Sequence, residues 1–88
     1  MRVDEDGWTR ANVGARVATE FPAAQAEHVL AILDQYRGDT PAGRARVQLA
    51  ILALAGGDVA KVAEYTADAQ RDFRDVLFQA GLPPRPST

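Results

Sequence analysis

Apolar residues recur every three or four positions along most of the chain, the spacing that places them on one face of an α-helix. The first predicted helix covers residues 9–20. Thr9 is expected to cap its start, with Trp8 and Val13 packing across that cap as a hydrophobic staple. Gly14 lies inside this helix and costs about 1 kcal/mol relative to alanine, so this is the weakest of the predicted helices.

The second predicted helix begins at Pro22, because proline lacks an N–H group and the first position of a helix needs none. An apolar stripe continues through Tyr36, and Gly38 is the expected C-terminal stop. Strand signals are absent, since no stretch alternates regularly between apolar and polar residues and no hairpin turn separates two apolar runs. The pattern therefore predicts an all-α chain.

The third predicted helix starts at Thr40 and Pro41, a cap followed by proline. Its apolar residues lie on two sides, because Leu49 and Leu52 point away from the main stripe. A helix that is apolar nearly all round is normally buried on both sides. Either the first helix covers its back or another chain does. The main stripe consists of Val47, Ala50, Ile51 and Leu54.

The fourth predicted helix follows Gly56 and Gly57, with Asp58 as its N-cap. It is expected to run without interruption over residues 59–80, a length of about 33 Å. Its apolar positions lie alternately three and four residues apart, as in a coiled-coil seam. The seam consists of Val59, Val62, Thr66, Ala69, Phe73, Val76 and Ala80.

Together these elements predict a small four-helix bundle, orthogonal or irregular, with a long C-terminal helix. The connections are short, so helices that follow each other in sequence are expected to be neighbours in space. We expect one helical domain over residues 9–81, between a flexible leader (1–8) and a disordered proline-rich tail (82–88).

Composition excludes several kinds of chemistry. The 88 residues contain no cysteine, which excludes disulfides, Cys-ligated zinc, iron–sulfur clusters and thiol nucleophiles. The only histidine, His28, is expected to project away from the apolar stripe of its helix, and no Gly-x-Ser-x-Gly or Walker A motif occurs. We therefore expect a non-enzymatic protein without a cofactor. The sequence shows neither a signal segment nor a membrane span, and we expect the protein in the cytoplasm.

Three acids of the fourth helix, Asp68, Asp72 and Asp75, share one broad face that could hold a divalent cation. Arg71 and Arg74 lie between them, however, and Arg71 is spaced to reach both Asp68 and Asp75. The favoured interpretation is a solvated face of ion pairs.

Asp72 borders the apolar arc of the fourth helix, so its carboxylate is expected to be partly desolvated and to need an arginine. We expect Arg46 to bridge to Asp72 or Asp75 as a structural clamp. Arg37, Arg44 and Arg46 could instead form an anion-binding patch. The net charge of −2 disfavours nucleic acid as the ligand but leaves a local basic patch open.

Phe78 is the strongest indication of a partner. On a regular helix it lies about 160° from the centre of the seam, among Arg71, Arg74 and Asp75. A large aromatic side chain outside the core face is typical of a contact surface. The alternative is that Trp8 or the proline-rich tail folds over it.

Two runs of the chain resemble short bacterial proteins of unassigned function. They are RVQLAILAL at residues 46–54 and RDFRDVL at residues 71–77, with LDQY at residues 33–36 fitting the same pattern upstream. The resemblance implies a compact helical fold and no catalytic activity.

These features predict a protein–protein interaction module, with a homodimer as one form it takes and no membrane partner. Its candidate contact residues are Phe78, Arg74, Leu49 and Leu52. The alternative is a small nucleic-acid-binding helical protein. A metal-dependent enzyme that uses the three aspartates is a third hypothesis. The nucleic-acid alternative would use Arg37, Arg44, Arg46 and Arg74.

Overall fold

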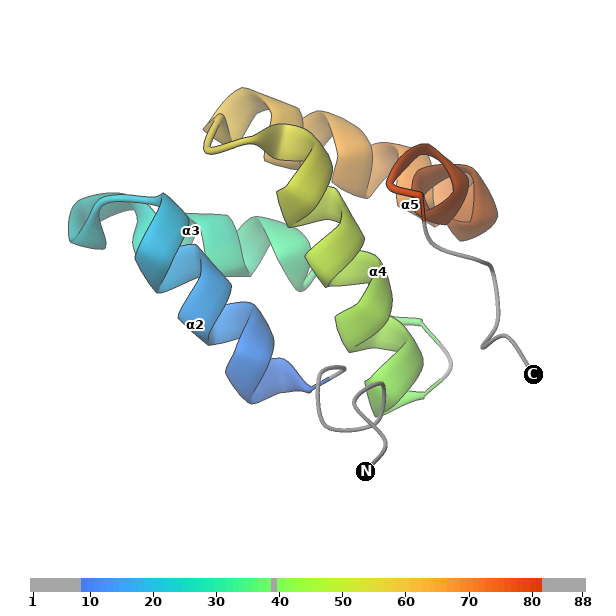
Figure 1. Cartoon of the computed structure of the whole chain (residues 1–88), viewed down its shortest axis with the longest axis horizontal. Helices are drawn as coiled ribbons and strands as arrows, with labels where there is room; N and C mark the ends of the chain where they lie inside the picture. The colour runs from blue at the N-terminus through green and yellow to red at the C-terminus, as the bar shows by residue number, and fades with distance from the viewer. Residues whose placement is uncertain (1–8, 39, 82–88) are drawn as a thin grey trace.

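A computed structural model of the protein describes residues 9–38 and 40–81, and these residues form four α-helices and no β-strand. The predicted all-α bundle with a long C-terminal helix is confirmed. The expected leader, the expected tail and the staple residue Trp8 lie outside the described residues. None of the described helices combines the length and the apolar character that crossing a bilayer requires. The helices are α2 (Arg10–Glu20), α3 (Ala23–Leu33), α4 (Pro41–Ala55) and α5 (Val59–Gln79), shown in Figure 1.

Three of the helices begin at the side-chain caps that the sequence predicts. In each, an extended residue accepts a hydrogen bond from a backbone N–H of the first turn, a donor that has no partner within the helix. The bonds run from Asn12 N to Thr9 Oγ1 (3.1 Å), from Gly43 N to Thr40 Oγ1 (2.9 Å) and from Ala60 N to Asp58 Oδ1 (2.9 Å).

The second helix differs from the prediction at both ends. Pro22 is the extended residue just before α3, and the helix ends at Leu33, well before Gly38. The following residues form a turn, in which the Tyr36 N–H donates to the Leu33 carbonyl oxygen at 3.0 Å. Tyr36 is nevertheless buried. Its apolar character therefore reflects packing of the connection onto the core, which a periodic pattern cannot distinguish from another helical turn.

The chain folds as two helical hairpins that pack against each other. One hairpin is α2 and α3, and the other is α4 and α5, joined at Gly56 and Gly57. Between the hairpins, α2 packs on α4 and α3 packs on α5, and Figure 1 shows α2 and α4 side by side with α5 lying across the end of α4. The expectation that sequential helices are neighbours is wrong for α3 and α4, which make no extensive contact.

Helix α4 lies in the middle of the bundle and is buried on both sides, as its two apolar faces predict. α5 packs on it, and so does α2, the helix expected to cover its back. Leu52 is fully buried and Leu49 is partly buried. The first of the two predicted alternatives therefore holds, since the chain covers α4 itself. The largest fully buried apolar side chains are Leu33, Ile51, Leu52, Leu77, Val13, Val17, Val29, Val47, Val62 and Val76.

Helix α5 is not the uninterrupted helix that the seam predicts. Asp72 has extended backbone angles (φ −159°, ψ 99°), so two helical pieces meet there at a kink. Its Oδ1 accepts the backbone N–H of Arg74 at 3.1 Å, which makes Asp72 the N-cap of the second piece. The kink shifts the register of the seam. Phe73, expected inside, is 37% exposed, whereas Leu77, which the predicted seam omits, is buried.

Candidate functional site

The structure separates the three arginines of the predicted anion patch. Arg37, in the connection after α3, and Arg44, near the start of α4, lie beside one cleft. Arg44 Nε donates to the carbonyl oxygen of Arg37 at 2.6 Å, which holds the connection against α4. Arg46 is only 8% exposed and is not part of the cleft lining. The patch therefore keeps two of its three predicted members.

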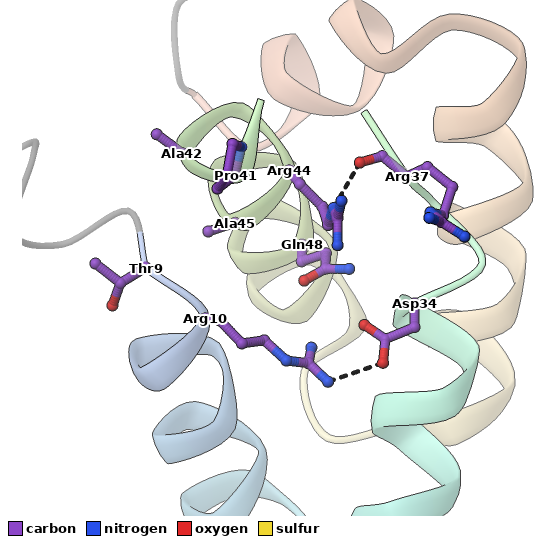
Figure 2. A pocket seen from close by; sticks show the side chains of 9 residues that line it. All are labelled: Thr9, Arg10, Asp34, Arg37, Pro41, Ala42, Arg44, Ala45 and Gln48. Atoms are coloured by element: carbon purple, nitrogen blue, oxygen red, sulfur yellow. Dashed lines mark hydrogen bonds and ion pairs between the residues drawn. The ribbon is translucent and has the colours of Figure 1, made fainter. Parts of the chain in front are cut away.

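The cleft lies where the C-terminal end of α3 meets the N-terminal ends of α2 and α4, and we call it the basic cleft. Arg10, Asp34, Arg37, Arg44 and Gln48 line it together with the first turn of α4. Its volume of about 600 Å³ is in the range of small-molecule sites. Figure 2 shows Arg10 reaching across to Asp34, with Nη2 donating to Oδ2 at 2.8 Å. Both side chains are about half exposed.

Gln48 is the cleft residue that sequence reasoning does not assign to a site. It is fully buried, and its Nε2 donates to the carbonyl oxygen of Leu33 at 2.7 Å. That bond fixes the orientation of the carboxamide, and its Oε1 has no hydrogen-bond partner. A buried acceptor without a hydrogen bond lowers the stability of the folded state by about 1–3 kcal/mol. The only sequence signal is a lone glutamine inside the apolar run of the third helix.

Two of the three aspartates on the predicted acidic face of α5, Asp68 and Asp72, are paired with neighbouring arginines on the same helix. Arg71 donates to Asp68, and Arg74 Nε donates to Asp72 Oδ1 at 3.1 Å. Hydrogen bonds from the side chain and then the backbone N–H of Arg74 lower the pKa of Asp72. Within residues 9–38 and 40–81, no group of three His, Cys, Asp or Glu side chains could hold a metal ion, and His28 is exposed on α3. This part of the chain gives the metal hypothesis no support.

The clamp expected between the third and fourth helices is replaced by a local contact. Asp72 pairs with Arg74, two residues ahead of it, and no ion pair within the described residues joins Arg46 to Asp72 or Asp75. The kink is the physical reason. Because Asp72 caps the second piece of α5, its carboxylate faces the backbone of its own helix and does not reach across to α4.

Phe78 is exposed, as its predicted position on the helix requires. It is 79% exposed and lies in residues 73–79, which we call the terminal segment of α5. Val76 and Leu77 of the same segment are buried, so the segment is anchored in the core on one side. Phe73 and Arg74 lie beside a shallow hollow next to Tyr36. An anchored helix segment thus presents one aromatic side chain fully and a second in part.

Comparisons with known proteins add no assignment. No family model matches the chain, and searches of curated proteins and of solved structures found no match. A functional proposal must therefore come from two features of the geometry: the exposed aromatic side chain on the terminal segment, and the basic cleft with its buried acceptor.

Proposed function

We propose that this chain is a protein-interaction module that self-associates through the terminal segment of α5. The observation that carries the proposal is Phe78, 79% exposed on a helix segment whose other side is anchored in the core. Burying an exposed phenylalanine side chain is favourable by about 1.5–3 kcal/mol. Contact with a second protein surface would bury Phe78 and release this free energy. We expect this non-enzymatic role to operate in the cytoplasm, with which a chain lacking cysteine is compatible.

The interface proposed here differs from the one that the hydrophobic pattern favours. Leu49 and Leu52 are covered in part or in full within one chain, so the two-sided helix α4 creates no need for a second copy. Of the four candidate contact residues, Phe78 and Arg74 remain exposed. Phe73 joins them, because the kink at Asp72 leaves it partly outside the core.

A second copy of the chain is the proposed partner because the surface near Phe78 carries charges of both signs. Arg71, Asp72, Arg74 and Asp75 are all exposed on consecutive turns of α5. A two-fold interface places the same patch on both sides, so it requires a patch that is complementary to itself. Arg71 and Arg74, which pair with Asp68 and Asp72 on their own helix, would exchange to acids of the second copy and so set the register, while burial of the aromatic side chains supplies affinity.

Sedimentation equilibrium over a concentration series tests the proposal. The apparent mass should rise from the 9.5 kDa of one chain towards twice that value. Phe78→Lys should hold the chain at one copy, whereas Gln79→Lys, which adds the same charge at the neighbouring exposed position, should still associate. At a protein concentration of about 1 mM, an association free energy of about 4 kcal/mol would produce a measurable fraction of dimer. A chain that remains strictly monomeric up to this concentration contradicts the proposal.

Nucleic-acid binding is the weaker candidate. Burial of Arg46 removes one of the expected cations from the surface, and Arg74 is engaged by Asp72. The chain's net charge of −2 also opposes phosphate backbones. Binding of a short duplex at low salt that falls steeply as salt is added, and that Arg44→Gln removes, would favour this function over self-association.

A further inference from the structure

We infer that the basic cleft binds a small oxyanion that carries its own hydrogen-bond donor, of which hydrogen phosphate is the simplest example. The cleft exists because α3 and α4, although consecutive in sequence, do not pack closely on each other. Its volume of about 600 Å³ suits a small molecule. None of its described lining residues belongs to α5, so the inference is independent of the proposed self-association.

Charge favours an anion in this cleft. Three arginines (Arg10, Arg37 and Arg44) and one acid (Asp34) line its described wall, an excess of two positive charges in a chain whose net charge is −2. The start of α4 adds the positive end of its helix dipole, although Pro41 has no N–H and the Gly43 N–H is already bonded to Thr40 Oγ1. Asp34 does not cancel this attraction, because Arg10 already neutralises it at 2.8 Å.

Arg44 is held in place for oxyanion recognition. Its Nε donates to the carbonyl oxygen of Arg37 at 2.6 Å, which fixes the plane of the guanidinium group beside the cleft. A planar guanidinium offers two parallel donors that match the spacing of two oxygens of one oxyanion. Figure 2 shows Arg44 on one side of the Gln48 carboxamide and Arg10 on the other.

Gln48 determines which oxyanion fits. Guanidinium and backbone N–H groups only donate, so a site built from them alone accepts any oxyanion. Gln48 is fully buried, its Nε2 is engaged by Leu33, and its Oε1 accepts no hydrogen bond. An oxyanion with a protonated oxygen satisfies the donors and this acceptor together. Sulfate carries no proton at neutral pH and would leave Oε1 unpaired.

The test compares phosphate with sulfate on the full chain. Isothermal titration at pH 7 and constant ionic strength should show saturable binding of inorganic phosphate. Sulfate should bind at least about tenfold more weakly, the loss expected when a buried acceptor stays unpaired. Glycolate and acetate repeat the comparison for carboxylates, because glycolate carries a hydroxyl donor and acetate does not. Tighter binding of glycolate than of phosphate would identify a hydroxy acid as the source of the oxyanion.

Variants and spectroscopy distinguish binding in the cleft from nonspecific attraction of anions to a charged surface. Arg44→Gln should weaken both anions about tenfold, whereas Arg16→Gln, which removes an exposed ion-paired arginine of α2, should change neither. Gln48→Met should abolish the preference for phosphate. Because that variant also loses the bond to Leu33 and can unfold, the shift of the Gln48 side-chain amide resonances with phosphate serves as a second readout in the unaltered chain. Equal affinity for phosphate and sulfate, or an unshifted Gln48 amide, would overturn the inference.

Discussion

Helices α4 and α5 differ in how completely the rest of the chain buries their apolar side chains. α4 is apolar nearly all round, a pattern that demands partners on two sides, yet α2 and α5 supply both within one chain. α5 has one well-formed apolar stripe, which should need a single neighbour, yet it breaks at Asp72 and leaves Phe73 of that stripe partly outside the core. Phe78, which lies off the stripe, is exposed as well. The number of apolar residues on a helix therefore does not locate an interface.

The length of the neighbouring helices decides which apolar side chains stay exposed. α5 has 21 residues and α4 has 15, so the last turns of α5 have less of α4 to pack against. The kink at Asp72 turns these last turns so that Val76 and Leu77 enter the core. Phe78 lies on the remaining side, where the described residues provide no cover for most of its surface.

The largest effect is expected for Leu52→Ala, which tests whether α4 is covered on both sides. A fully buried leucine loses about 2–5 kcal/mol of unfolding free energy when truncated, because a cavity remains. Leu49→Ala, at a partly buried position of the same helix, should cost about 1 kcal/mol. Urea denaturation of both variants measures the difference. Equal losses would contradict the unequal cover of the two positions.

The next effect concerns Asp58, the cap at the start of α5. Asp58→Ala removes the oxygen that accepts the Ala60 N–H at the start of the helix and should cost about 1 kcal/mol. Asp58→Asn keeps an equivalent acceptor and should be close to neutral in the same thermal denaturation. Similar losses for the two variants would show that charge, and not capping, is the contribution of Asp58.

A smaller, pH-dependent effect is expected at Asp72. Arg74 holds the pKa of this carboxyl below its ordinary value of 3.8. The charged form therefore stabilises the fold above that value, and the stabilisation disappears as the pH falls through the lowered pKa. Asp72→Asn keeps the cap but removes the charge, so its melting temperature should lie below that of the unaltered chain near neutrality and converge with it in acid.

Carboxyl carbon NMR of Asp72 checks the cause directly. Arg74→Gln should raise the pKa of Asp72, because it removes the side-chain hydrogen bond that is the largest contribution. A titration of Asp72 at or above its ordinary value in the unaltered chain would contradict the pairing with Arg74.

The smallest effect on folding is expected for Phe78→Ala. An exposed side chain contributes little to the folded monomer, so the unfolding free energy at low protein concentration should change by less than about 0.5 kcal/mol. At high concentration the same substitution should lower the melting temperature, because it removes the proposed dimer contact. A large loss at low concentration would mean that Phe78 is covered within its own chain.

The helical class, three caps and the turn at Gly56 could be predicted from the sequence. Gly56 has a left-handed backbone (φ 58°), and Thr9, Thr40 and Asp58 cap as expected. The break at Asp72 could not, because residue spacing places this aspartate beside the apolar arc and does not show that its carboxylate accepts the N–H of Arg74. The partial desolvation expected for this carboxylate is wrong, since Asp72 is exposed. Within the described residues Asp72 bonds to Arg74 of its own helix, and no ion pair joins it to Arg46.

The sequence by itself determined where three of the four helices begin and which helix needs cover, because caps, turns and apolar stripes depend on residues within a few turns of each other. Only the tertiary structure decided what covers α4, which way the terminal segment of α5 faces, and which side chains meet in the basic cleft. Arg10 and Asp34 are 24 residues apart, and Gln48 is 15 residues from its partner Leu33. Contacts at such separations depend on how whole helices pack, and no local spacing encodes them.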